Sequence, residues 1–402
     1  MQWHFFIARL KHGARALFRP TTRARRYVSK EFSVDRFFHE LAARQIRYVV
    51  LRWFETLPGI AKGEDVDLLV ADEDLSKTET LFSPTRTSLP CDVYSVSGLT
   101  GSDFRKMAYY PPHLAEQLLS RAVLFKDLYR VPDVRDHFLS LAYHALYHKG
   151  YRSGLASSQS KVGTVVKRPD HNYEQVLTKL AAKLSMDVAI NLESLDECLA
   201  AEGWRPPSDM LALLAIRNRW IHSRFFRDAP AVAPRHRDIA VFLVRERAVQ
   251  LGLDNQLERE FETLGFRVLA TTMLSAEDQA RVALQLRGGN WRQGPTPCSG
   301  GPPARVMVVW DPQPLAVPLL TKSNHPLLDN FRVRRAKKQI RSQMLRGVSR
   351  SQSFNPLRSS DNDFQAWEYL EVLMPEQINE LRSMVEALHE NALEQPIRSS
   401  AA

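Results

Sequence analysis

The stretch GEDVDLLVADED, residues 63–74, combines a short run of Val and Leu with regularly spaced acids. Alternate side chains of a β-strand point to opposite faces, so Asp65 and Asp67 would share one face and the apolar residues between them the other. A third acid, Asp92, lies inside the predicted strand CDVYSV, residues 91–96, where a carboxylate is costly unless something binds it. Mg²⁺ takes hard oxygen ligands and bridges a triphosphate in phosphoryl or nucleotidyl transfer. The sequence therefore predicts a catalytic metal site at these acids.

The flanking residues indicate how these strands are supported. SVDRFFHELAARQ, residues 33–45, has the periodicity of an amphipathic helix, with Ser33 as its N-cap. YVVLRW, residues 48–53, is typical of a short strand. An alternative interpretation is a strand-end loop whose acids are merely solvated, with Asp92 hydrogen-bonded at a sheet edge.

A strand-borne Asp-x-Asp pair followed by a third acid on a later strand resembles the nucleotidyltransferase superfamily, over about residues 34–130 of this chain. The resemblance implies a mixed sheet with helices, an NTP substrate (ATP by preference) and Mg²⁺ as cofactor. It also implies that Asp65 and Asp67 are metal ligands and Asp92 a metal ligand or general base. The family's Gly-Ser or Gly-Gly turn is replaced here by LRWFETLPG, and Arg52 within it would contact phosphate instead.

Length and composition limit the class of protein. The 402 residues are 44% hydrophobic and 25% charged, as in a globular protein of two or three domains. The three cysteines lie far apart without CxxC spacing, which indicates neither a disulfide framework nor a zinc site, and a cytoplasmic location is expected. Because no apolar run reaches about 18 residues, no membrane span is expected.

The net charge of +10 is unevenly distributed. Residues 1–30 contain many Lys and Arg side chains and no acid, and a second basic run covers residues 332–350. The first segment would form a basic amphipathic helix that lies on an anionic membrane surface, which would make the protein membrane-peripheral, or that contacts RNA. The alternative is a disordered solubilising arm. Such charge favours polyanionic ligands.

Residues 131–228 are predicted to be helical throughout and to form a separate domain, followed by a linker at residues 229–236. His137, His144 and His148 would share one helix face, and they would either bind a metal or pack against a neighbouring domain or ligand.

The segment HKGYRSG, residues 148–154, would end this helix. Lys149 and Arg152 flank glycines that let the backbone approach an anion, so they would hold the triphosphate of a nucleotide. The alternative is an ordinary helix C-terminus with Gly150 as its cap.

Strand and helix signals alternate again over residues 237–390, and a disordered tail is expected at residues 391–402. The most specific features are a Phe-Glu-x-x-Gly-Phe sequence at 261–266, the strand VMVVW at 306–310 and an Asn-x-x-x-x-Ser-Asp frame that begins at Asn355. These features resemble a nucleoside diphosphate kinase. The resemblance implies an α/β sandwich of ferredoxin-like topology, with a homo-oligomer formed through this domain as one expected assembly.

In that family a histidine accepts the γ-phosphate, but Arg358 occupies its position here. A guanidinium has no free lone pair at neutral pH and cannot attack phosphorus, so the phosphotransfer is expected to be lost. The domain would then be a pseudokinase that still binds the polyphosphate of a nucleotide. The predicted contacts are Arg245, Arg332, Arg341, Asn355 and Arg358.

These patterns together favour a nucleotide-binding transferase whose N-terminal domain moves a nucleotidyl group from an NTP to an unknown acceptor. One alternative is a non-catalytic nucleotide-binding or assembly module. Another is a nucleoside diphosphate kinase that retains some phosphotransfer through a different nucleophile, for which His325 is the candidate.

Overall fold

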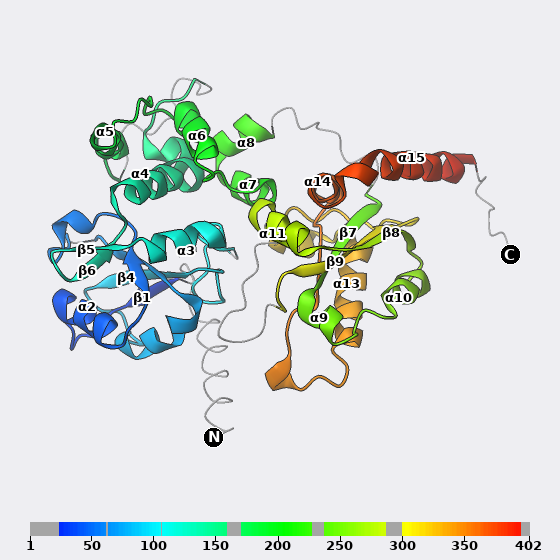
Figure 1. Ribbon diagram of the computed structural model, residues 1–402, viewed down its shortest axis with the longest axis horizontal. Coiled ribbons are helices and arrows are strands. Elements are labelled where there is room, and N and C mark those ends of the chain that lie inside the picture. Colours follow the sequence, from blue (N-terminus) through cyan, green and yellow to red (C-terminus); the bar gives the residue numbers. More distant parts are fainter. Residues whose placement is uncertain are drawn as a thin grey trace. The chain divides into compact units, whose positions relative to one another are not determined.

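The computed structural model has a mixed α/β fold and describes residues 24–61, 63–105, 107–158, 170–226, 237–286 and 300–394. The chain forms two compact units (Figure 1). The N-terminal unit comprises residues 1–144 and 171–204, and the C-terminal unit comprises residues 145–170 and 205–402. The helices predicted as one domain over residues 131–228 are thus divided between the two units. In the part of the chain that is described, no helix is long and apolar enough to cross a membrane.

The N-terminal unit contains a four-stranded sheet of order β1-β4-β3-β2, in which β3 and β4 are parallel and the other pairs antiparallel. Ser33 caps the first helix, as predicted, by accepting a hydrogen bond from the backbone of Arg36. The main elements are β1 (Arg25–Tyr27), α2 (Val34–Ala43), β2 (Tyr48–Val50), β3 (Val66–Val70), β4 (Pro90–Ser95), α3 (Pro112–Ser120), β5 (Val123–Phe125), β6 (Tyr129–Val131), α4 (Val134–Tyr143), α5 (Tyr173–Lys183) and α6 (Leu192–Ala201).

Strand β3 alternates in the way that its sequence predicts. Val66, Leu68 and Val70 belong to a hydrophobic core that also contains side chains of α2, so the intervening Asp67 faces the other side of the sheet. Strand β4 alternates similarly, with Asp92 between two core residues. Each fully buried Val or Leu side chain contributes about 1.5–3 kcal/mol. This burial fixes the register and holds the acids on the opposite face.

The sheet begins at Arg25, inside the segment that the sequence assigns to a basic arm. Strand β1 pairs with the edge of β4, so residues 25–27 are part of the folded unit and are neither a helix nor a free arm. Residues 1–23 lie outside the described part of the chain, as do the predicted linker at 229–236 and residues 395–402 of the predicted tail. Helix α15 extends to Glu394, so the fold continues beyond the boundary expected at residue 390.

The C-terminal unit contains an antiparallel sheet of order β10-β7-β9-β8. Its main elements are a π-helix within His144–Lys149, a 3₁₀-helix (Gly150–Ser153), α7 (Ser208–Ala215), α8 (Arg219–Phe225), β7 (Ile239–Arg245), α9 (Glu246–Gln250), α10 (Leu257–Thr263), β8 (Arg267–Met273), α11 (Ala276–Gln285), β9 (Pro303–Trp310), α12 (Leu319–Asn324), α13 (Phe331–Met344), β10 (Leu357–Ser359), α14 (Asp363–Leu373) and α15 (Ile378–Glu394).

Helices cover both faces of this sheet. Val241 and Leu243 of β7 pack with residues of α11, α14 and α15, whereas Phe242 and Val244 pack with residues of α9, α10 and α13 (Figure 1). All seven residues of β7 are buried, which is why the first six, residues 239–244, form a continuous apolar run before Arg245. The alternation of strands and helices expected over residues 237–390 is present, whereas α9, α12 and β10 were not predicted.

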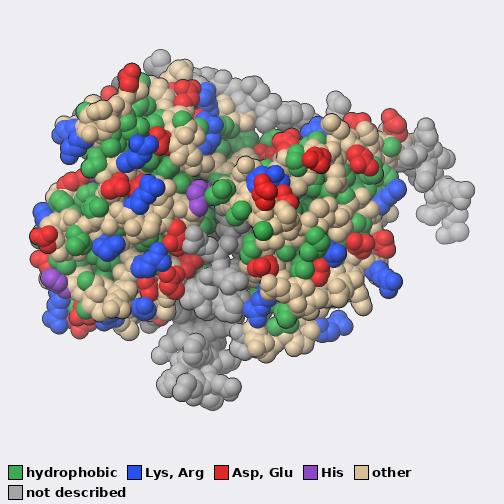
Figure 2. Space-filling model, viewed as in Figure 1, with side chains coloured by type: hydrophobic (Ala, Val, Ile, Leu, Met, Phe, Trp, Pro, Cys, Tyr) green, Lys and Arg blue, Asp and Glu red, His purple; other side chains and the backbone are tan. Residues whose placement is uncertain are grey.

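Charges of both signs are interspersed on the surface. On the face shown in Figure 2, Lys and Arg side chains alternate with Asp and Glu over both units. The excess of positive charge therefore forms no single patch on that face.

Gly150 and Asn218 connect two helical segments of the C-terminal unit. Asn218 donates from Nδ2 to the carbonyls of Leu146 and Tyr147 at 2.9 and 3.0 Å, and its Oδ1 caps α8 by accepting from the backbone of Trp220 at 3.1 Å. Gly150 has a φ of +57°, and a Cβ there would lie 2.2 Å from Asn218 Oδ1. The glycine thus ends the π-helix and leaves room for the asparagine.

We expect Gly150→Ala to destabilise the C-terminal unit more than Gly347→Ala does. Both positions have positive φ, so both variants carry backbone strain of about 1–3 kcal/mol. A Cβ at Gly347 meets no atom within 4 Å, whereas the one at Gly150 displaces Asn218 and adds about 1–3 kcal/mol of overpacking. Calorimetric unfolding of the full chain measures both changes, and equal losses would contradict this role of Gly150.

Candidate functional site

The three predicted acids lie together on one face of the N-terminal sheet. Asp67 and Asp92 are directly opposite each other in the parallel pair β3–β4, and Asp65 immediately precedes β3. Asp67 and Asp92 are 4% and 8% exposed. The period-two pattern therefore brings the carboxylates together as expected, in surroundings where their charge must be compensated.

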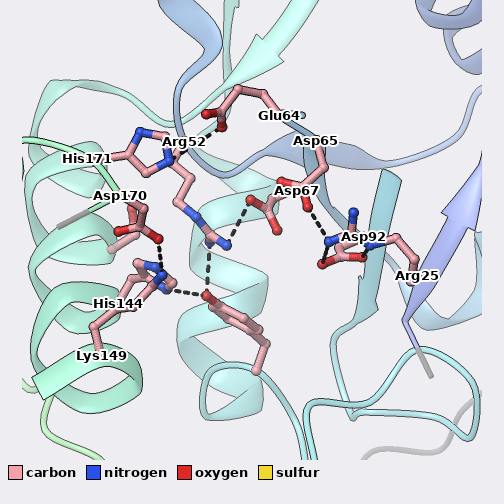
Figure 3. A network of polar contacts seen from close by, with 12 residues as sticks. Arg25, Arg52, Glu64, Asp65, Asp67, Asp92, His144, Lys149, Asp170 and His171 are labelled. Atoms are coloured by element: carbon pink, nitrogen blue, oxygen red, sulfur yellow. Dashed lines mark hydrogen bonds and ion pairs between the residues drawn. The ribbon is translucent and has the colours of Figure 1, made fainter. Parts of the chain in front are cut away.

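The cation nearest two of these acids is Arg25, which sequence reasoning placed in the basic arm. Strand β1 sets Arg25 directly opposite Asp92, and its guanidinium binds both Asp65 and Asp92 (Figure 3). Nη2 donates to Asp92 Oδ2 at 3.1 Å, and Nε lies 2.6 Å from Asp92 Oδ1. Burial by itself would lower the pKa of Arg25, but Asp92 and Asp65 outweigh it and raise that pKa.

Arg52 compensates the third acid. Its Nη2 lies 2.8 Å from Asp67 Oδ2, and both residues are buried. Burial raises the pKa of Asp67 to about 7, with Arg52 opposing and Asp65 and Asp92 adding to the rise. The sequence predicts a phosphate contact for Arg52, but in this structure the residue is the ion-pair partner of a buried acid.

Behind Arg52 lies a buried chain of hydrogen bonds that the sequence did not reveal. Arg52 Nη1 donates to the Tyr109 hydroxyl at 2.9 Å, and that hydroxyl lies 2.5 Å from His144 Nδ1. His144 Nε2 in turn lies 3.3 Å from the hydroxyl of Tyr173. The chain fixes the guanidinium through His144, which follows the last residue of α4, and Tyr173, the first residue of α5. No spacing in the sequence relates these four residues.

Next to Arg52, Trp53 has a left-handed backbone with a φ of +56°, which is rare for a bulky residue. Its indole stacks on His171 at a centroid distance of 4.0 Å, and Glu64 Oε2 lies 3.5 Å from His171 Nε2. Figure 3 shows His171, one member of this aromatic pair, beside Arg52 and Glu64. Sequence reasoning did not identify it.

The predicted histidine face serves packing. His144 belongs to the hydrogen-bonded chain, and His137 packs against the ring of Phe54 at 4.7 Å. Burial lowers the pKa of His137 to about 4. Within the residues that the structure describes, no group of three His, Cys, Asp or Glu side chains is arranged to hold a metal ion.

The acids nevertheless fit a divalent cation in donor chemistry. All three offer carboxylate oxygens, which Mg²⁺ prefers. Asp92 Oδ1 is buried and accepts no hydrogen bond from a described residue, although Arg25 Nε lies 2.6 Å from it. The oxygens are turned toward the two arginines, which explains why they do not form a metal-ligand arrangement here. Displacement of Arg25 would leave Asp65, Asp67 and Asp92 to hold the ion.

The predicted anion contacts at residues 148–154 have partners within the protein. Lys149 forms an ion pair with Asp170, and Arg152 Nη2 donates to the carbonyl of His148 at 3.1 Å. Gly150 adopts the left-handed conformation at the end of the π-helix. The structure therefore favours the alternative interpretation, a capped helix C-terminus.

In the C-terminal unit, Arg245, Arg341 and Arg358 come together as predicted. Arg358 lies on β10 next to β7, which ends at Arg245, and Arg341 Nε donates to the carbonyl of Leu357 at 2.7 Å. Burial and then Arg358 lower the pKa of Arg245 well below its usual value, and they lower that of Arg341 to about 10. Three guanidinium groups are thus close enough for their charges to affect one another in a buried place.

A fourth member, Lys337, was missed. It lies one turn before Arg341 on α13, a spacing from which the sequence could have identified it. Burial lowers the pKa of Lys337 to about 7, with Asp361 opposing and Arg341 and Arg358 adding to the decrease.

We call Arg245, Lys337, Arg341 and Arg358 the cation cluster. Asn355 borders it, because a Cβ on Gly300 would lie 2.6 Å from the Asn355 carbonyl and 3.1 Å from Cβ of Arg245.

The structure gives Arg332 a different role from the predicted one. Its Nη1 lies 2.6 Å from Asp311 Oδ1, its Nη2 donates to the carbonyl of Leu264 at 2.8 Å, and its guanidinium lies over the ring of Phe266. These contacts fasten the start of α13 to neighbouring elements. Arg332 as a nucleotide contact stays a prediction, and in this structure the buried Asp311, distant in sequence, binds it.

We expect Arg52→Met to destabilise the N-terminal unit by about 3–5 kcal/mol, because it leaves Asp67 buried without its cation. Arg47 is the matched control: it pairs with Glu73 and Glu116 at 2.8 Å each, but its side chain is 47% exposed. Arg47→Met should therefore cost less than about 1 kcal/mol. Hydrogen exchange of β3 amides in the full chain measures both changes, and similar losses would refute the structural role of Arg52.

Comparisons with known proteins identify no family. No family model matches the chain, and a search of curated proteins finds no match. What the chain does is therefore argued from its own residues: three acids held by two arginines in one unit, and a cluster of four cations in the other.

Proposed function

We propose that the N-terminal unit catalyses metal-dependent transfer of a nucleotidyl group from an NTP, with ATP as the first choice, to an acceptor hydroxyl or phosphate. The observation that carries this proposal is the in-register pairing of Asp67 and Asp92 on parallel strands, with Asp65 beside them and a cation already bound. A mixed sheet with an Asp-x-Asp pair on one strand and a third acid on its neighbour also supports the resemblance to nucleotidyltransferases.

Each residue has a distinct task in this proposal. Asp65, Asp67 and Asp92 would hold Mg²⁺, which would neutralise triphosphate oxygens and the charge that develops in transfer. Arg52 fixes the orientation of Asp67, and Tyr109 and His144 fix Arg52. In the alternative to metal binding, Asp92 would act as a general base toward the acceptor, a role that suits a carboxyl group whose pKa is raised by burial.

The C-terminal unit supports a second candidate function, the binding of a nucleotide polyphosphate without transfer. The observation behind it is the cation cluster, whose members repel one another and would gain from a bound anion. Its strand order, β10-β7-β9-β8, is that of a ferredoxin-like sheet and supports the resemblance to nucleoside diphosphate kinases. Arg358 cannot accept a phosphoryl group, so we assign this unit binding only.

The location and remaining partners are also proposals. The cysteine usage favours the cytoplasm, and the basic N-terminal segment favours contact with RNA or an anionic membrane surface. That segment lies mostly outside the described residues.

Labelled NTPs with Mg²⁺ test the proposed transfer. We expect the wild-type chain to release pyrophosphate or to label an acceptor, the chain itself included, and Asp65→Asn/Asp67→Asn to reduce this to background. Asp127→Asn/Asp187→Asn is the control, since it removes the same charge from exposed positions of the same unit. Turnover that survives in the acid variant, or no turnover by the wild type with any of the NTPs, would refute the proposal.

The cation cluster predicts a pH-dependent affinity for triphosphate. The pKa of Lys337, about 7, lies below its usual value, so the side chain is charged below pH 7 and must take up a proton to bind an anion above it. Affinity should therefore fall as the pH rises from 6 to 8.5, beyond any change due to the ligand. Lys337→Gln should lose about tenfold at pH 6 and show a flatter profile.

Calorimetric titration with inorganic triphosphate measures these affinities. Lys338→Gln, which removes an exposed charge from the next position of α13, should behave as the wild type does. Identical pH profiles for the wild type and Lys337→Gln would exclude Lys337 from the binding site.

A further inference from the structure

Arg25 occupies the place where a divalent cation would bind. It approaches from β1, at the edge of the N-terminal sheet, and lies between Asp65 and Asp92 (Figure 3). A guanidinium and a metal ion compete for the same carboxylate oxygens, so both cannot be bound there at full strength.

The charges favour exchange of one cation for the other. When all three carboxyl groups are ionised they carry a charge of −3, and Arg25 and Arg52 together carry +2. Withdrawal of Arg25 leaves −2, which a single divalent ion neutralises. Arg52 is the less suitable residue to leave, because it is buried and also held by Tyr109, whereas the side chain of Arg25 is 27% exposed.

One carboxylate oxygen of the site, Oδ1 of Asp92, is suited to a metal ion. Asp92 is 8% exposed, and its Oδ1 accepts no hydrogen bond from a described residue. Arg25 compensates this oxygen by proximity alone, at 2.6 Å from Nε. A metal ion has no directional requirement for a donor hydrogen and would satisfy the oxygen better.

The location of Arg25 allows its release without unfolding the sheet. Strand β1 has three residues and pairs only with β4 among the described strands, so the β3–β4 pair that positions the acids does not depend on it. The long side chain can also turn toward solvent while the backbone stays paired.

We propose that Arg25 is an intramolecular competitor that holds the acid site closed to divalent cations until a polyphosphate anion draws its guanidinium away. The proposal rests on the proposed function in taking the three acids as the cation site. Its consequence is that metal and nucleotide bind cooperatively, since the nucleotide removes the residue that excludes the metal.

Mn²⁺ alone, titrated into the full chain and followed by electron paramagnetic resonance of the free ion, tests this role. Arg25→Gln should bind Mn²⁺ about tenfold more tightly than the wild type, and Arg25→Lys, which retains the charge but not the forked donor, should be intermediate. The control is Arg44→Gln, whose residue pairs with Glu40 on α2, and it should leave the affinity unchanged. Adding Asp65→Asn/Asp67→Asn to Arg25→Gln should abolish the gain.

The outcomes separate this proposal from the proposed function. Tight Mn²⁺ binding by Arg25→Gln without NTP turnover supports the competitor and refutes the transferase. Acid-dependent turnover by the wild type, with equal or weaker Mn²⁺ binding by both Arg25→Gln and Arg25→Lys, refutes the competitor alone. If Arg25→Gln folds only partially, recovery of its thermal transition on addition of Mn²⁺ would support the proposal. In that case the decisive variant is Arg25→Lys, and a Mn²⁺ affinity no higher than that of the wild type would overturn the proposal.

Discussion

A carboxylate can be buried only if a positive charge accompanies it, and the N-terminal unit is built around that requirement. Asp67 and Asp92 face each other across the β3–β4 pair, with Arg25 of β1 beside Asp92 and Arg52, which follows β2, beside Asp67. The two acids thus lie in the middle of one row that crosses the sheet, with an arginine at each end. Removing either arginine leaves a negative charge that the fold must accommodate in another way.

This row also determines what the remainder of the unit must supply. A guanidinium that compensates a buried acid has to be held in position, and the chain from Arg52 through Tyr109 to His144 and Tyr173 does so with buried side chains. The C-terminal end of α4 and the N-terminal end of α5 therefore support the site although neither helix carries a proposed metal ligand. The histidine face that suggested a metal in the sequence has this supporting role instead.

The two units present opposite electrostatic conditions. In the N-terminal unit, arginines satisfy clustered acids. In the C-terminal unit, Arg245, Lys337, Arg341 and Arg358 are clustered, and burial, followed by the charge of neighbouring cations, lowers the pKa values of three of them. Arg358 is the exception, because Tyr369, Asp361 and Asp209 together outweigh burial and raise its pKa.

The sequence predicted the features that depend on periodicity. Alternation placed Asp65, Asp67 and Asp92 on one face, and apolar runs located β7 and β9, because burial of regularly spaced residues leaves a local pattern. The contacts that modify the site depend on residues far apart in the chain. Arg25 lies 67 positions from Asp92, and Arg332 lies 21 positions from Asp311, so no local pattern could indicate either pair.

Lys337 has a consequence for covalent chemistry. An ordinary lysine, with a pKa of about 10.4, has roughly one amine in 2,500 unprotonated at pH 7. With a pKa of about 7, Lys337 has about half, so it would react with acylating or carbamylating compounds far faster than an exposed lysine does. The burial and charge crowding that favour an anion at the cation cluster would therefore also favour reaction of Lys337 with electrophiles, and a bound anion would protect this amine.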